Sequence, residues 1–255
     1  MDDREALVGS MNLAKKFYNY HDLMMHVRGP IALDMSRQFD FDWYHATHPK
    51  APAPRALVHV EPASVQAPGP DGAGLIRLVG TGLGRKTGWE ALKPLLANAK
   101  SSIHVQMHEL GDGPALDALI AAHRRGVDVR IILDPGIIDE FVPIIHKGPR
   151  GIVNAVAVDQ LLKAKVNVRH YRTDHRFTTA HMKLAVIDGQ VLFAGSTNWT
   201  PGGFERVAET NLEIHGGRAP AQAEAQFAQD WVQRAVPAEP PSALALALCK
   251  LYNKR

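Results

Sequence analysis

The segment from His181 to Asn198, HMKLAVIDGQVLFAGSTN, constrains the fold more than any other part of the chain. Apolar residues alternate in LAVID and in VLFAG, which predicts two short strands, and the dipeptide Asp188-Gly189 between them is a strong signal for a hairpin turn. Residues two apart on a strand share a face, so we expect the side chains of His181 and Lys183 to point into the same space.

The residue types in this hairpin suit the binding and cleavage of phosphate esters. An imidazole can attack phosphorus and leave again, and a lysine ammonium can hold phosphoryl oxygens as a point charge. The side chains of Ser196 and Asn198 can donate hydrogen bonds to the same oxygens. His181 and Lys183 could instead be an accidental pair on a strand, but the further polar positions favour a phosphate site that needs no metal.

Elements of alternating type precede the hairpin. The patterns are strand-like at 75–80, 101–110 and 127–134, and helix-like at 88–100 and 113–126. This alternation predicts an α/β layered domain with a mixed or parallel sheet. A Pro-, Ala- and Gly-rich linker is predicted between two units. The expected parts are a first unit at 1–46, the linker at 47–74, a main domain at 75–235 and a helix-like tail at 236–255.

The motif H-x-K-x4-D, formed by His181, Lys183 and Asp188 and followed by G-S-x-N, resembles the signature of the phospholipase D superfamily. The resemblance implies an α/β/α layered fold of two pseudo-symmetric halves, each contributing one histidine to a shared active site. It implies that these three residues are catalytic, that Ser196 and Asn198 bind substrate phosphate, and that no cofactor or metal is needed.

The resemblance also implies a two-step reaction on a phosphodiester. One histidine attacks phosphorus to give a phosphohistidine while the other protonates the leaving alcohol, and water or a second alcohol then resolves the intermediate. In the family the first motif usually supplies the nucleophile, which would make His181 the acid and base partner. Because the first motif is lacking here, the role of His181 stays open.

The N-terminus resembles the end of a first motif. Ser10 and Asn12 belong to a second G-S-x-N element, and Asp2 precedes it at the spacing with which Asp188 precedes its own. We therefore expect a chain truncated within the first motif, with Ser10 and Asn12 binding phosphate, followed by one complete half. Met1 could be a true start or an internal methionine.

The segment 21–43 resembles the tail that follows the motif in cardiolipin synthases and related two-motif phospholipases. It contains Asp22, a Gly29-Pro30 pair suited to the first turn of a helix, and Phe39 and Trp43 on one helical face. We expect these two aromatic side chains to lie in the core. The same aromatic spacing recurs within 220–236, which favours two repeats.

A catalytic histidine needs a third group, usually a carboxylate, to fix its tautomer. The resemblance implies a downstream N-x-E element for His181, and Asn211 with Glu213 fits it, with Glu209 as second choice. By the same logic Asp22 is the expected counterpart for the absent first histidine. Glu213 could equally be an ordinary strand carboxylate.

Composition limits which covalent cross-links, metal sites and cellular locations are possible. The single cysteine excludes an intramolecular disulfide and a cysteine-rich zinc site. His104 and His108 share a strand face but lack a third ligand, so we predict no metal site; the resemblance places His108 or Glu109 at the border of the pocket. No apolar run could span a bilayer and no secretion signal is present in the sequence given, which predicts a cytoplasmic or membrane-peripheral protein.

Three functions remain open. The first is a phosphatidyltransferase or phospholipase resembling cardiolipin synthase, with a phospholipid substrate and peripheral membrane contact. The second is an endonuclease of the same superfamily that works without metal as a homodimer. The third is a catalytically incomplete fragment or binding protein. The net charge of +3 suits anionic lipid and nucleic acid equally, so it does not choose between them.

Overall fold

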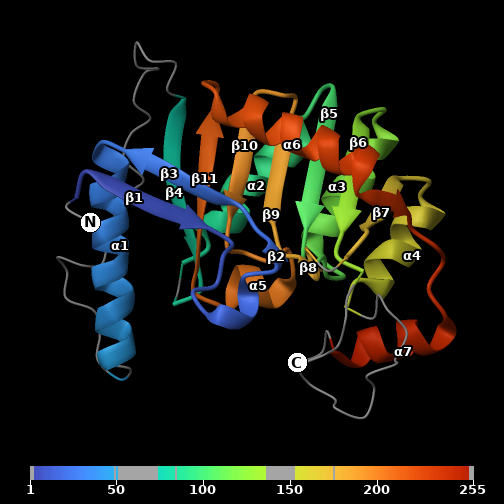
Figure 1. The fold of residues 1–255 in the computed structure, drawn as a ribbon, viewed down its shortest axis with the longest axis horizontal. Coiled ribbons are helices and arrows are strands. Elements are labelled where there is room, and N and C mark those ends of the chain that lie inside the picture. Colours follow the sequence, from blue (N-terminus) through green and yellow to red (C-terminus); the bar gives the residue numbers. More distant parts are fainter. Residues whose placement is uncertain are drawn as a thin grey trace.

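A mixed sheet of eight strands forms the centre of the computed structural model, which describes residues 3–48, 50, 74–83, 85–135, 153–174 and 176–252 (Figure 1). The strand order is β12-β7-β6-β5-β9-β10-β11-β4, with β5, β6 and β7 parallel and the other neighbours antiparallel. Their bounds are β4 Leu75–Thr81, β5 Ser102–Met107, β6 Asp128–Leu133, β7 Asn167–Tyr171, β9 Lys183–Ile187, β10 Val191–Gly195, β11 Glu209–His215 and β12 Ala235–Pro237.

Helices cover both faces of this sheet (Figure 1). On one face, α2 (Thr87–Asn98), α3 (Pro114–Arg124) and α4 (Ala155–Lys163) bury aliphatic side chains against inward residues such as Val105 and Ala185. On the other face, α6 (Ala219–Gln233) and part of the N-terminal unit pack on residues such as Leu184 and Leu192. The α/β prediction and the main elements are therefore confirmed.

The predicted hairpin between β9 and β10 is present. Asp188 and Gly189 at its turn have φ of 52° and 65°. Ile187 and Val191 pair across a loop of three residues, in which the Gln190 amide donates to the Ile187 carbonyl over 3.0 Å. Asp188 and Gly189 are thus the central residues of a β-turn in the left-handed conformation, which glycine and aspartate tolerate better than most residues.

The N-terminal unit, residues 3–48, repeats part of the main domain on a smaller scale. Its strands β1 (Glu5–Gly9) and β3 (Met24–Arg28) form an antiparallel pair, and α1 (Pro30–Thr47) follows with proline in its first turn. The same order occurs in β10, β11 and α6, which also begins with proline in its first turn. Between β1 and β3 lie the short helix η1 (Lys15–Phe17) and β2 (Tyr20–His21).

The expectation that Phe39 and Trp43 are core residues is wrong. They stack on each other, yet each is 63% exposed. Their counterpart Phe227 on α6 is 1% exposed, because His104 of β5 stacks on it. In the part of the chain that the structure describes, no sheet lies against this face of α1.

Two further parts complete the architecture. The helix α7 (Ala243–Tyr252) lies within the expected tail at 236–255 and packs Ala245 and Cys249 against α4. Most of the predicted linker at 47–74 lies outside the described residues. No described helix combines the length and apolarity needed to cross a bilayer.

Candidate active site

His181 and Lys183 lie at the start of β9, where the chain leaves the short strand β8 (Thr179–Ala180). Two contacts fix this point: β8 pairs in parallel with β2, and the His181 amide donates to the carbonyl of His21 over 2.9 Å. The Lys183 Nζ atom lies 2.8 Å from both the Nε2 atom and the carbonyl oxygen of His181. The predicted convergence of the two side chains is therefore present.

Asp22 orients the histidine. Its Oδ1 atom lies 2.8 Å from Nδ1 of His181, and both side chains are largely buried. Because a carboxylate only accepts hydrogen bonds, Nδ1 carries the proton, and Nε2 keeps the lone pair that accepts from Lys183. The assignment of Asp22 to the absent first histidine is thus corrected: Asp22 bonds to His181 itself.

The carboxyl group of Asp22 is held ionised. Burial raises the pKa of Asp22, but hydrogen bonds from His181 and Ser10 and the nearby charge of Lys183 lower it further, so that the net shift is downward. Ser10 donates to Asp22 over 2.6 Å. Ser10 therefore supports the group that orients the histidine.

Burial also affects the lysine. It lowers the pKa of Lys183 to about 8, although the carboxylates of Asp22, Glu209, Glu109 and Asp134 act in the opposite direction. In a desolvated site the ammonium attracts a contacting anion more strongly than it would in water, although the carboxylates around it offset part of its charge. Lys183 is therefore the group in this site that can bind a phosphoryl oxygen.

Two aromatic rings hold the imidazole of His181. Tyr20 approaches it at 5.3 Å between ring centroids and His108 at 4.7 Å. Burial lowers the pKa of His108 to about 3, with Lys183 and His181 contributing, so this ring is neutral. The prediction that His108 borders the site agrees with this contact, whereas no signal in the sequence singled out Tyr20.

Ser196 and Glu209 form a second copy of the Ser10 and Asp22 unit. Ser196 Oγ donates to Glu209 and accepts from the amide of Thr210, as Ser10 Oγ donates to Asp22 and accepts from the amide of Leu23. Burial raises the pKa of Glu209, opposed by Ser196 and Lys183. Among the described residues, no histidine bonds to Glu209.

Glu213 does not orient His181. Its carboxylate binds Arg77 of β4 and lies 2.6 Å from Nε2 of His215. The β10 partner of Glu213 is Phe193, two residues before Gly195, so Glu213 lies along the strand away from the Ser196 end. The first choice for the orienting carboxylate was therefore wrong.

Asp188 stands at the opposite end of β9 from Lys183. Its carboxylate accepts hydrogen bonds from the amides of Lys100, Ser101 and Ser102 and from the hydroxyl of Ser101. Burial raises the pKa of Asp188, but these amide donors lower it to about 2. The structure thus gives Asp188 a contact with the start of β5 rather than with His181, against the catalytic assignment.

The other predicted residues differ in their surroundings. Asn198 Oδ1 is buried without a hydrogen-bond partner among the described residues, whereas Asn12 is exposed. Asp2 lies outside the described residues. Within the described part of the chain, no group of three or more His, Cys, Asp or Glu side chains is arranged to hold a metal ion.

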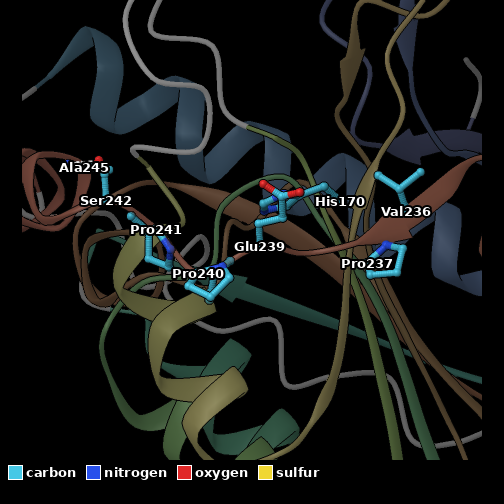
Figure 2. A pocket seen from close by; sticks show the side chains of 10 residues that line it. His170, Val236, Pro237, Glu239, Pro240, Pro241, Ser242 and Ala245 are labelled. Carbon is cyan, nitrogen blue, oxygen red and sulfur yellow. Dashed lines mark hydrogen bonds between the residues drawn. The ribbon is translucent and has the colours of Figure 1, made fainter.

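A separate cavity of about 320 Å³ lies beside α4 and α7 (Figure 2). His170 and Glu239 are among its polar lining residues, and prolines and small aliphatic side chains supply the rest. Burial lowers the pKa of His170. None of the predicted site residues lines this cavity.

Comparison with known proteins agrees with the geometry. A family profile described as cardiolipin synthase, PLD-like domain, matches residues 92–231. A cardiolipin synthase of Clostridium perfringens is 24% identical over 238 residues, which cover 90% of this chain and 48% of that protein. A phospholipase D of Rickettsia felis is 31% identical over 136 residues, which cover 53% of this chain and 58% of that protein.

Solved structures show the same fold. Phosphatidylserine synthase of Haemophilus influenzae matches with a TM-score of 0.69 at 14% identity, covering 100% of this chain and 66% of that one. Nuc, a phospholipase D family member from Salmonella typhimurium, matches with a TM-score of 0.51 at 20% identity, covering 64% of this chain and 98% of that one.

The chain spans about half the length of the cardiolipin synthases that it matches. The family profile covers more than half of this chain and includes the hairpin with His181 and Lys183. The resemblance drawn from the sequence motif is thereby confirmed. The chain belongs to the phospholipase D-like family whose profile is described as cardiolipin synthase, PLD-like domain.

Proposed function

We propose that this chain is the histidine-bearing part of a phosphatidyltransferase that resembles cardiolipin synthase and acts through a phosphohistidine. The arrangement of His181 between Asp22 and Lys183 carries the proposal. Asp22 fixes the proton on Nδ1, which leaves the Nε2 lone pair for a proton or for phosphorus. Lys183 lies where it can hold a phosphoryl oxygen.

In the proposed reaction, Nε2 of one histidine forms a bond to phosphorus while the bond from phosphorus to the leaving alcohol breaks. The second histidine gives its proton to the departing oxygen. It then takes a proton from the incoming alcohol or water, whose oxygen displaces the first histidine from phosphorus. His181 is assigned to the second role by the family resemblance, and trapped phosphate on His181 would reverse the assignment.

We infer a place for the second histidine beside Ser196 and Glu209. By analogy with Ser10 and Asp22, which bind His181, the pair of Ser196 and Glu209 is suited to bind a histidine from another half. A strand is also lacking beside β1, because β1 pairs with β3 alone among the described strands, whereas its counterpart β10 pairs with β11 and β9. One strand that pairs with the free edge of β1 and carries its own H-x-K motif would supply both the missing strand and the missing histidine.

A second copy of this chain does not fit that place. Its β9 already pairs with β10 on one edge and β5 on the other, and its His181 already bonds to its own Asp22. A preceding half of the same polypeptide fits better, because it would end in a strand with a free edge. It would also cover Phe39 and Trp43, as β5 covers Phe227. A homodimer of this chain is therefore the less suitable arrangement.

A phospholipid is the proposed substrate because cardiolipin synthases align over most of this chain. Their activity belongs to proteins about twice as long, so the proposal concerns this chain together with a preceding half. In such a protein, the alcohol of one phosphatidylglycerol would resolve the intermediate formed from another. The outcome would be cardiolipin and glycerol.

The test begins with the coding DNA that precedes Met1, read for an in-frame H-x-K-x4 that ends at Asp2. The longest open frame is then expressed and incubated with phosphatidylglycerol vesicles, and the lipids are measured by mass spectrometry. We expect cardiolipin from the wild type and from His123→Ala, a substitution on α3, and none from His181→Ala.

Two outcomes would oppose the lipid proposal. Cleavage of DNA in the presence of EDTA, without lipid turnover, would favour the nuclease alternative. Equal lipid turnover in wild type and His181→Ala would refute the assignment of the active site.

A further inference from the structure

A chain segment next to the candidate site carries exposed apolar side chains. The segment 11–19 runs from Ser10 to Tyr20, both of which adjoin the His181 assembly. Within it Leu13 is 93% exposed and Tyr18 is 69% exposed. A single exposed leucine is common on protein surfaces, so Leu13 becomes informative only together with other exposed apolar side chains near the site.

A second exposed group lies on the equivalent segment of the main domain. The segment 197–208 lies between Ser196 and Glu209, just as 11–19 lies between Ser10 and the residues that lead to Asp22. Within it Val207 is 49% exposed. The loop after β4 lies against it: Thr81 Oγ1 donates to the Val207 carbonyl over 2.8 Å, and Leu83 is 44% exposed. Figure 1 shows the blue segment that follows β1 and contains η1 beside α5 (Pro201–Glu205), at the same end of the strands.

Basic side chains accompany these apolar ones. Lys15 in the first segment, Arg206 in the second and Lys86 after β4 are all exposed. We call Leu13, Lys15, Tyr18, Leu83, Lys86, Arg206 and Val207 the rim. Apolar side chains that insert between lipid headgroups, beside cations that attract anionic headgroups, are typical of proteins that bind a membrane surface.

We propose that the rim docks the protein on the surface of an anionic phospholipid bilayer, with the site facing the headgroups. This inference rests on the proposed lipid substrate and extends it, since it states how that substrate is reached. A nucleic acid is the less suitable partner. Its phosphates would use the lysines and the arginine but would leave Leu13, Leu83 and Val207 in water.

The test is co-sedimentation of the chain with vesicles of phosphatidylglycerol and phosphatidylcholine, compared with vesicles of phosphatidylcholine alone. We expect binding to the anionic vesicles that weakens as salt rises. Leu13→Asp should lower the partition coefficient by about tenfold or more, since it replaces an inserted aliphatic group with a charge. Circular dichroism verifies that each variant folds.

Two controls separate docking by the rim from general adhesion. Val232→Asp changes a side chain on α6 that is 77% exposed and outside the rim, and it should alter binding less than about twofold. Trp43→Asp tests the exposed aromatic pair on α1 in the same way. An effect of Trp43→Asp or Val232→Asp as large as that of Leu13→Asp would overturn the proposal.

The outcomes are distinguishable from those of the proposed reaction, because vesicle binding requires no turnover. Binding that depends on Leu13 would support the rim even if the longer protein formed no cardiolipin. Absence of binding to anionic vesicles would refute the rim while leaving turnover to be judged separately. Salt-sensitive binding to duplex DNA that is unchanged by Leu13→Asp, without vesicle binding, would assign this region to nucleic acid.

Discussion

Replacing Asp188 by asparagine should destabilise the protein without removing a reacting group. The four hydrogen bonds to the carboxylate lower its pKa from the ordinary 3.8 to about 2, which corresponds to about 2.5 kcal/mol of differential stabilisation. The side chain is partly exposed, so solvent screening reduces this to roughly 1–2 kcal/mol. Urea unfolding followed by tryptophan fluorescence at pH 6 measures the loss.

The pH dependence supplies a second readout. Between pH 3.8 and about 2 the unfolded state binds a proton at Asp188 that the folded state does not. This contribution is therefore complete above about pH 5 and is lost as pH falls through that interval. The variant should lack this loss. Asp159→Asn, which removes an exposed ion pair with Lys163 on α4, is the control and should cost less than about 1 kcal/mol. An unchanged unfolding midpoint in Asp188→Asn would refute the structural role.

Three further perturbations test the site and the fold. The Lys183 ammonium should lose its proton as pH rises through about 8, so turnover by the longer protein should fall above that pH. The free energy of unfolding should instead rise between pH 8 and 10.5, because in that interval only the unfolded state still binds the proton. Asp22→Asn should lower turnover by roughly 10²- to 10⁴-fold by destabilising the required tautomer of His181, as steady-state kinetics would record. Phe227→Ala should cost about 3–5 kcal/mol in urea unfolding, but Phe39→Ala less than about 1 kcal/mol in this chain.

Local patterns in the sequence were sufficient for the hairpin. The alternation on both sides of Asp188-Gly189 determines which side chains share a face, and this alone brings His181 close to Lys183. The helices and strands between 75 and 134 follow in the same way from their apolar periodicity. These predictions succeeded because each depends on residues that are near in the chain.

The orienting carboxylate could not be found by that reasoning. Asp22 and His181 are 159 residues apart, and their contact depends on the parallel pairing of β2 with β8, which has no local signature. The N-x-E pattern near the motif instead indicates Glu213, which pairs with Arg77 in the strand register and binds it. The prediction that Phe39 lies in the core was wrong for a similar reason. Helical spacing predicts which side chains share a face but not what covers that face.

The pairing of β2 with β8 has a consequence for the order of folding. Joining segments 159 residues apart costs roughly 4–5 kcal/mol in chain entropy, which two residues of strand cannot recover without the packing of the N-terminal unit on Leu184 and Leu192. The eight-stranded sheet can form and bury Trp199 before this contact closes. The N-terminal unit is therefore expected to join late and to leave first on heating. On heating, activity should therefore be lost before the sheet unfolds. Trp199 should still be shielded from water when Asp22 no longer bonds to His181.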